Sequence, residues 1–276
     1  MCEFCHEHGE GKKWYLQAKN YSEELWNEER KLMTKDFFEK FEQNAVEMFG
    51  SGDQMSMADP ATVEAMLPLM VEEQKKNHWG QVVPIEEIEQ ILDMAVNITR
   101  LPCACRSVTR GVYDARFCFG VTTFREGWTG ILEYPDWSTG LEELTTEEAK
   151  KAIQKLDRNG LVHTIWTFIT PYIGGVCNCT VTDCLAMRGR LRSGIPVAFP
   201  FFKAEHVATI DWEECSGCRD CIKVCNFGAI SYSPSVHKCY INQFECFGCG
   251  VCRAVCPKDA VMLRDRNTIP ALAGEW

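Results

Sequence analysis

The sequence has no long apolar run. The longest, over 195–202, is broken by prolines, whereas a helix that spans a bilayer needs roughly 20 apolar residues. The first residues also lack the basic segment and apolar stretch of a secretory leader. We therefore expect no membrane span, and we expect a cytoplasmic chain whose thiols stay reduced.

Cationic charge is also scarce. The chain has 29 Lys and Arg against 39 Asp and Glu, and its formal net charge is −10. Because nucleic-acid binding depends on clustered cations that neutralise phosphates, this composition argues against a nucleic-acid partner. No G-x-G-x-x-G motif joins a strand to a helix, so the usual signal for a dinucleotide site is missing.

Cysteine, by contrast, is abundant. The 17 cysteines fall in local groups with gaps of one or two residues, which is typical of metal ligands rather than of disulfide partners. Two groups share the spacing C-x-x-C-x-x-C-x-x-x-C, which places three thiolates around one iron–sulfur cluster and directs the fourth away from it. The first group is Cys215, Cys218, Cys221 and Cys225, and the second is Cys246, Cys249, Cys252 and Cys256.

The two groups belong to an internal duplication. Residues 210–215 align with 241–246, and the same offset persists through the segments that follow, where 229–230 align with 260–261. We therefore expect two related half-units that pack face to face. Cys239 lies outside the repeat, and we interpret it as a small buried apolar residue. Turn glycines such as Gly248 would let backbone N–H groups approach cluster sulfurs.

From about Ala208 to Leu263 the sequence resembles the bacterial-type dicluster ferredoxins. The resemblance implies two 4Fe-4S clusters, and each would take three cysteines of one group and the last cysteine of the other. Asn226 departs from the pattern, since it stands where the family usually has proline, and this bears on the turn geometry and on the potential of the adjacent cluster. The implied ligands are Cys215, Cys218, Cys221 and Cys256 for one cluster and Cys246, Cys249, Cys252 and Cys225 for the other.

Zinc is the rival interpretation of these eight cysteines. Structural zinc sites favour paired C-x-x-C knuckles separated by longer spacers. Three cysteines in immediate succession fit a cluster better.

Six further cysteines lie upstream in three short groups that abut Gly or Pro: Cys103, Cys105, Cys118, Cys177, Cys179 and Cys184. Soft thiolates gather where soft metals bind, so we predict a further iron–sulfur cluster that uses four of them, with the other two beside it. Zinc and a metal-free set of buried thiols stay open as alternatives. Arg106 and other arginines flank these groups and would neutralise an anionic cluster.

The layout from about Leu101 onward also resembles proteins of anaerobes that join a CxCR segment, a CNC segment and a C-terminal dicluster ferredoxin. That resemblance implies a shared architecture but no reaction. At the N-terminus, Cys2 and Cys5 are candidates for a separate zinc or iron site, together with two nearby histidines.

The predicted fold class is α+β, in three regions. Residues 1–100 form a helical N-terminal region, 101–205 a cysteine-rich α/β region with the additional metal site, and 206–276 a dicluster ferredoxin domain of two pseudo-symmetric ββ/α half-units. Hydrophobic periodicity, capping signals and β-branched runs predict the main elements: one long helix or two short ones over 22–49, helices over 61–76, from Pro84, and over 146–157 with Thr145 and Glu148 as a capping box, and a strand over 161–169.

These observations favour an iron–sulfur electron-transfer protein. It would relay electrons between a redox partner protein and the upstream cluster through the two ferredoxin-type clusters, as a carrier or redox subunit rather than a stand-alone catalyst. One alternative is an oxidoreductase whose upstream cluster keeps an open coordination position and reduces a small substrate. Another is an interaction module with structural zinc upstream.

Overall fold

Helices and strands are mixed along the chain in the computed structural model. Within the part of the chain that the structure describes, no helix is both long and apolar enough to cross a membrane. Cys2 and Cys5 lie outside that part. The structure describes residues 13–41, 43, 59–77, 80–128, 140–192 and 201–273.

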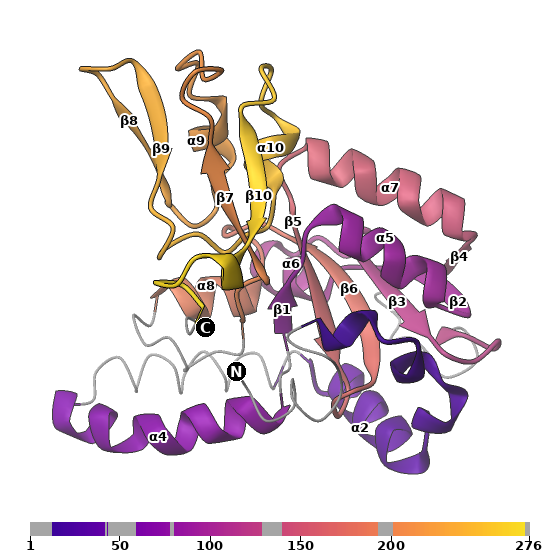
Figure 1. Ribbon diagram of the computed structural model, residues 1–276. Coiled ribbons are helices and arrows are strands. Elements are labelled where there is room, and N and C mark those ends of the chain that lie inside the picture. The colour runs from indigo at the N-terminus through magenta and orange to yellow at the C-terminus, as the bar shows by residue number, and fades with distance from the viewer. Residues whose placement is uncertain are drawn as a thin grey trace.

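A six-stranded sheet forms the body of the molecule (Figure 1). Its strand order is β1-β5-β6-β3-β2-β4, and every neighbouring pair is antiparallel. Because side chains alternate across a strand, the sheet has two chemically different faces, one apolar and one rich in thiols. The strands are β1 (Gly80–Val82), β2 (Asn97–Leu101), β3 (Cys118–Thr122), β4 (Glu142–Leu144), β5 (Val162–Thr167) and β6 (Ile173–Cys179).

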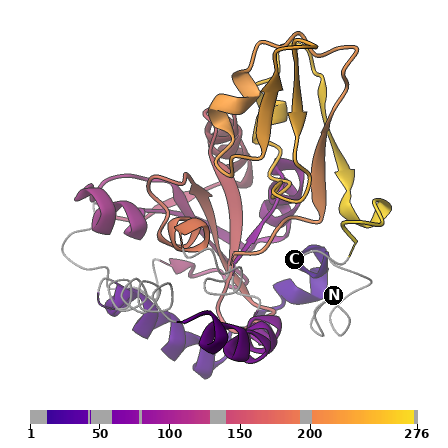
Figure 2. The same ribbon diagram turned by 90° about the vertical axis from the view of Figure 1, so that its left-hand side faces the viewer.

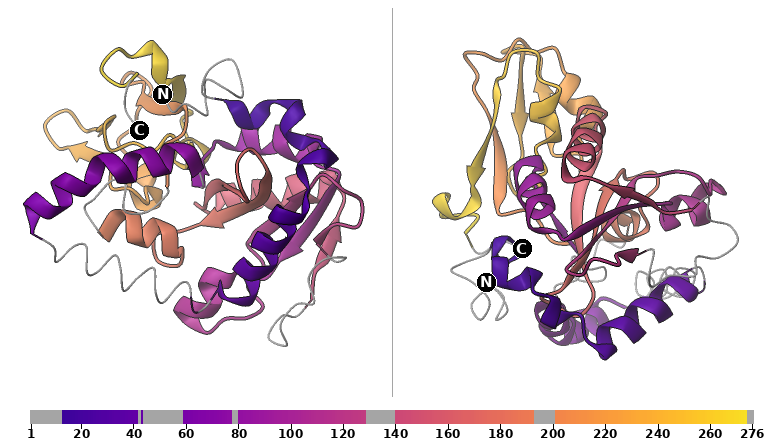
Figure 3. Two further views of the ribbon diagram at one scale, coloured as in Figure 1. Left: turned by 90° about the horizontal axis from the view of Figure 1, so that it is seen from below. Right: turned by 90° about the vertical axis from the view of Figure 1, so that its right-hand side faces the viewer.

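Helices cover the two faces of the sheet. On the apolar face, α5 (Ile85–Met94) and α7 (Thr146–Arg158) lie side by side and bury a core that includes Ile88, Ile153 and Val176 (Figure 3). Helix α7 begins with the predicted capping box, in which the side chain of Thr145 accepts from the backbone N–H of Glu148. The remaining helices are α2 (Glu28–Glu39), α4 (Pro60–Asn77), α6 (Ala104–Arg110) and α8 (Leu185–Arg192), with 3₁₀ turns η1 (Trp14–Leu16), η2 (Ala18–Tyr21) and η3 (Glu23–Leu25).

The first hundred residues are not all helical, which corrects the prediction. Strands β1 and β2 lie there and belong to the same sheet as the cysteine-bearing strands. All three residues of β1 are buried, so it shows no alternation that would mark it as a strand. The expected helix from Ser22 is also shorter, because Asn27 caps α2 whereas Ser22 caps only η3. Part of its predicted span to Phe49 falls outside the described residues.

The C-terminal module, in orange and yellow, lies to one side of the six-stranded sheet and rises to the top of the view (Figure 2). Each repeat contributes strand, helix and strand, and the two halves interleave because β7 pairs with β10 and β8 pairs with β9. The sequence predicted a constant offset between the repeats, and the same offset relates all three pairs of elements. The first repeat holds β7 (His206–Ile210), α9 (Asp220–Val224) and β8 (Ile230–Ser233), and the second holds β9 (Lys238–Ile241), α10 (Val251–Ala254) and β10 (Val261–Asp265), followed by η5 (Arg266–Thr268).

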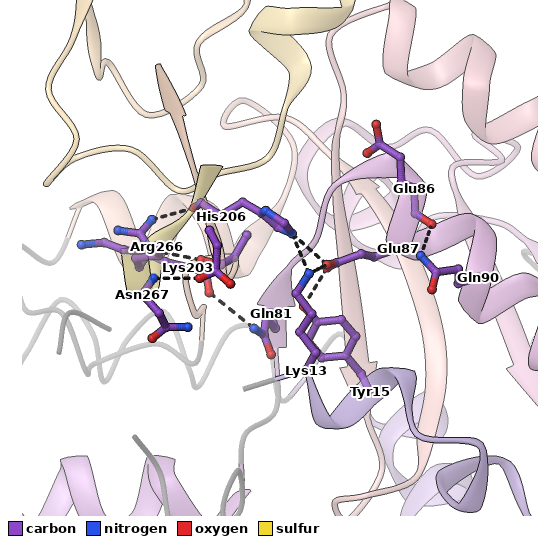
Figure 4. Close-up of polar contacts among 12 residues, drawn as sticks. Lys13, Tyr15, Gln81, Glu86, Glu87, Gln90, Lys203, His206, Arg266 and Asn267 are labelled. Carbon is purple, nitrogen blue, oxygen red and sulfur yellow. Dashed lines mark hydrogen bonds and ion pairs between the residues drawn. The ribbon is translucent and has the colours of Figure 1, made fainter. Parts of the chain in front are cut away.

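A buried polar network attaches this module to the rest of the chain (Figure 4). The carboxylate of Glu87 on α5 is 3% exposed and accepts hydrogen bonds from Tyr15 Oη (2.7 Å) and His206 Nε2 (2.8 Å), and it pairs with Lys13 Nζ (2.6 Å). Burial raises the pKa of Glu87, but these three partners outweigh it and hold the pKa below its ordinary value. Because His206 opens β7, the network joins the N-terminal segment, α5 and the module.

Candidate metal centres

Four cysteines from both repeats line the same cavity of the C-terminal module. Cys225 of the first repeat and Cys246, Cys249 and Cys252 of the second line one cavity of about 20 Å³. Burial, and then the neighbouring Cys249, Cys246 and Cys225, raise the pKa of the Cys252 thiol well above its ordinary value. The fold thus gathers the four cysteines that the family resemblance groups together. Four soft sulfur donors around one small cavity suit an iron–sulfur cluster.

The other cysteines of the motifs lie across the pseudo-symmetric core. Cys215 and Cys221 are buried, whereas Cys218 is exposed. Cys256 packs against the same core that holds Cys215 and Cys221. Burial, and then Cys239, Cys218 and Cys215, raise the pKa of Cys221 to about 12. Cys239 is 1% exposed and packs in this core, in keeping with its interpretation as a small buried residue.

Backbone N–H groups approach one of these sulfurs. Cys246 Sγ accepts from the N–H of Gly248 at 3.4 Å and from that of Ala208 at 3.5 Å. Gly248 has a φ of +70°, and a Cβ there would lie 2.0 Å from the carbonyl oxygen of His206. Only glycine fits this turn. N–H groups aimed at a thiolate sulfur stabilise its negative charge and tune a cluster's potential.

The equivalent turn of the first repeat, at Gly217, is equally tight. Gly217 has a φ of +70°, and its Cβ would lie 2.3 Å from the carbonyl oxygen of His237. His206 and His237 themselves occupy equivalent positions of the two repeats. Each cysteine loop therefore packs against backbone of the other repeat, at His206 in β7 and at His237 just before β9.

Comparison with known proteins identifies this part of the chain. Residues 214–260 match the 4Fe-4S dicluster domain family. The matched span contains all eight motif cysteines and none of the upstream ones. No curated protein and no solved structure matches the chain. We refer to residues 206–273 as the dicluster module.

The six upstream cysteines converge on the thiol-rich face of the six-stranded sheet. Cys118 and Cys177 are register partners on β3 and β6, and their sulfurs are 3.5 Å apart. Contacts between neighbouring thiols continue from Cys118 to Cys103, Cys105, Cys184 and Cys179. The sequence predicted that these cysteines would lie near one another, and the fold brings all six together. They come from β3, β6, the start of α6 and the turn before α8: Cys103, Cys105, Cys118, Cys177, Cys179 and Cys184.

Arg106 supplies the counter-charge of this thiol site. It is 6% exposed, and its guanidinium donates to Cys103 Sγ (3.3 Å), to Asp183 Oδ2 (3.1 Å) and to the carbonyl oxygen of Asn178 (3.4 Å). Hydrogen bonds from Cys105 and Cys118, with the charge of Arg106, hold the pKa of Cys103 well below its ordinary value despite burial. An anionic sulfur at this position is therefore favoured.

Sequence reasoning missed the polar residues that hold this arrangement. Asn178 lies between two cysteines on β6, where its Oδ1 lies 2.6 Å from His163 Nδ1 and its Nδ2 donates to the carbonyl oxygen of Phe117 (2.7 Å). Asp183 accepts from Arg106 and Arg110. The one sequence signal for both was their position beside cysteines, since neither belongs to a recognisable motif.

The thiol site borders a cavity of about 370 Å³. Among the side chains that the structure describes, no three Cys, His, Asp or Glu close around a point as ligands of one metal ion would. This holds equally for the dicluster cysteines. An iron–sulfur cluster is larger than an ion, so its ligands stand further apart. Apart from the cysteines, the cavity is lined mainly by apolar residues: Phe37, Phe38, Phe41, Leu101, Pro102, Phe119, Trp166, Phe168, Leu185 and Ala186, with the glycines Gly174 and Gly175.

Asn226 joins the dicluster module to the upstream thiol site. Its Oδ1 accepts from the N–H of Val181 at 2.9 Å, and its Nδ2 donates to the carbonyl oxygen of Gly160 at 3.3 Å. Val181 lies in the loop between Cys179 and Cys184. The residue that departs from the family's proline is thus a structural link, which a proline has no side-chain groups to make.

An aromatic layer fills the rest of this junction. Phe227 and Phe247 stack with ring centroids 4.0 Å apart, and Phe201 lies against both. The apolar cluster that contains them also includes Cys179 and Cys184 on one side and Cys249 on the other. Thiols of the dicluster module and of the upstream site are therefore parts of one continuous packed layer.

Proposed function

We propose that this chain is an iron–sulfur electron-transfer protein with two 4Fe-4S clusters in the dicluster module and a third metal cluster at the upstream thiols. The single observation that carries the proposal is the meeting of Cys225 with Cys246, Cys249 and Cys252 around one cavity. By the pseudo-symmetry of the repeats, the first cluster takes Cys215, Cys218, Cys221 and Cys256. The clusters supply the redox chemistry, and the protein sets their order and access.

The packing supports a direction for the relay. Cys249 shares an apolar cluster with Cys179 and Cys184, so the cluster it binds is the inner one, next to the upstream site. Cys218 is exposed, so its cluster is the outer one and faces a redox partner protein. Electrons would pass between the partner and the upstream site through the outer and then the inner cluster.

Iron fits the upstream site better than zinc. A structural zinc ion takes four ligands at about 2.3 Å for sulfur, whereas six thiols lie here beside a cavity of about 370 Å³. Cys103 contacts Arg106, and Cys179 and Cys184 belong to the apolar cluster that also holds Cys249. Cys105 contacts both Cys103 and Cys184, so we take these four as the first candidates for ligands. The second candidate function, an iron–sulfur reductase that acts on a small molecule, is favoured by the size of that cavity.

Metal analysis of an anaerobic preparation tests the proposal. We expect about twelve irons and as many labile sulfides per chain, as three cubane clusters require. A variant with Cys105→Ser and Cys179→Ser should keep about eight. Cys239→Ala is the matched control, because this cysteine is buried but outside both motifs, and it should keep all twelve.

Two outcomes would overturn parts of this proposal separately. Eight irons with one zinc in the wild type would make the upstream site structural zinc and leave the dicluster assignment intact. A colourless anaerobic preparation without labile sulfide would remove the electron-transfer function altogether.

A further inference from the structure

The cavity beside the upstream thiols is much larger than a cluster of this chain needs. The four thiols that enclose the inner cluster's position line about 20 Å³, whereas the upstream cavity measures about 370 Å³ by the same measure. The larger figure falls in the range of small-molecule binding sites, roughly 300–1,000 Å³. The inner-cluster site thus serves as an internal standard, and by that standard the upstream cavity has space for a ligand as well as a cluster.

The far wall of this cavity is aromatic. Phe37 and Phe38 of α2 reach the thiol-rich face of the sheet, and the ring of Phe37 lies 5.4 Å from that of Phe168, centroid to centroid. Trp166 of β5 forms another part of the wall. Flat rings of this kind give a ligand apolar area and stacking partners.

The described lining offers no free charge to a ligand. Arg106 is its one cation, and it is engaged by Cys103, Asp183 and the carbonyl oxygen of Asn178. Asn178 in turn uses both side-chain groups on His163 and Phe117. A charged ligand would lose its hydration here without gaining a partner, which is costly.

We infer that this cavity binds a small, uncharged organic molecule with a flat apolar body, between the aromatic wall and the upstream thiols. The inference adds a ligand class to the reductase alternative of the proposed function. It rests on that alternative only where the ligand is called a substrate. Its chemical class follows from the lining, since apolar walls reward buried apolar area and the engaged cation is not available to an anion.

Gly175 offers a way to fill the cavity without disturbing its walls. It lies on β6 two residues from Cys177, so strand alternation places its missing side chain on the thiol-rich face. A Cβ at Gly175 would meet nothing closer than the carbonyl oxygen of Phe119 at 3.8 Å. At the adjacent Gly174, by contrast, a Cβ would lie 2.3 Å from the ring of Phe168. Gly175 therefore tolerates a side chain that Gly174 does not.

Equilibrium dialysis under anaerobic conditions tests the inference with two matched probes, naphthalene and naphthalene-1-sulfonate, on the full-length chain. We expect one saturable naphthalene site and binding of the sulfonate weaker by at least about tenfold, because the charge is desolvated without a partner. Gly175→Ala, Gly175→Val and Gly175→Leu should weaken naphthalene binding progressively, to about tenfold or more for leucine, as buried space is lost. Ser231→Leu, at an exposed strand position of the dicluster module, is the matched control and should bind like the wild type.

The outcomes separate this inference from the proposed function. Equal binding of both probes, or naphthalene binding that all three Gly175 variants leave unchanged, would overturn the ligand site even if twelve irons are present. Saturable naphthalene binding that the variants abolish, in a chain with only eight irons, would support the site and remove the upstream cluster. The graded series keeps the test decisive if the leucine variant does not fold.

Discussion

Gly248→Ala gives the sharpest test of how the dicluster module holds its inner cluster. The left-handed backbone at this position costs a non-glycine residue about 1–2 kcal/mol. The new Cβ would also lie 2.0 Å from the carbonyl oxygen of His206, and no flexible side chain is available to move aside. The turn or strand β7 must shift instead.

That shift disturbs the two N–H groups that bind Cys246 Sγ, since one belongs to Gly248 and the other to Ala208 on β7. Hydrogen bonds to a charged acceptor are worth about 1.5–3 kcal/mol each. With the backbone cost, the variant should lose on the order of 4–8 kcal/mol if both hydrogen bonds are lost. We expect it to purify with about four irons fewer than the wild type.

Gly228→Ala is the matched control. Gly228 has a φ of +66° in the same module, but a Cβ there would have no neighbour within 4 Å. The Gly228→Ala variant should lose only about 1–2 kcal/mol of stability, from the left-handed backbone alone. It should keep its iron and unfold at a midpoint lower by a few degrees. The assay is anaerobic iron and sulfide analysis combined with thermal unfolding followed by circular dichroism. Equal iron content and equal midpoints in the two variants would refute the reasoning from the close approach to His206.

Three further predictions concern the junctions of the molecule. Glu87→Gln should destabilise the chain by about 1–3 kcal/mol at neutral pH. Because folding lowers the pKa of Glu87, the stabilisation from its carboxylate is present above the ordinary glutamate pKa of about 4.3 and is lost as pH falls through the lower folded pKa. The unfolding curves of wild type and variant should therefore converge in acid. Asn226→Ala should leave the iron content unchanged but speed hydrogen exchange in the loop at Val181, whose N–H loses its acceptor; unchanged exchange there would contradict the linking role. Arg106→Lys should lower iron toward about eight per chain, because an ammonium group does not reproduce the forked contacts of the guanidinium, while an unaltered count would show that the forked geometry is dispensable.

The dicluster module was predictable from the sequence because its information is local. The motif cysteines sit at fixed short spacings, and the duplication carries over to every strand and helix of the module. Helix α7 was predictable for the same reason, since its capping box lies within a single turn, from Thr145 to Glu148. Where the determinants of an element lie within a few residues, the sequence pattern is sufficient to predict that element.

The upstream site was only partly predictable, because its contacts are long-range. The sequence showed that six thiols come in groups, but only the sheet register places Cys118 opposite Cys177. Strand β1 was missed because burial on both faces removes alternation. Strand β2 carries buried Ile98 and half-buried Arg100 on the same face, so its pattern does not alternate regularly either. Part of the aromatic wall of the cavity comes from α2, which lies far along the chain from the first thiol of the site, and no local pattern predicts such a contact.

The differences between the two repeats explain why a symmetric module has one inner and one outer end. Around the inner cluster, four positions carry the residues that contact the upstream region, through either the apolar cluster or the hydrogen bonds of Asn226. Their equivalents around the outer cluster are polar or solvent-facing. The pairs are Phe247 and Ser216, Val251 and Asp220, Asn226 and Pro257, and Phe227 and Lys258. The motif cysteines have the same spacing in the two halves, so the residues beside them determine which end of the module packs against the upstream region. Since the outer end keeps proline after its last cysteine, the asparagine at the inner end is explained by docking rather than by cluster binding.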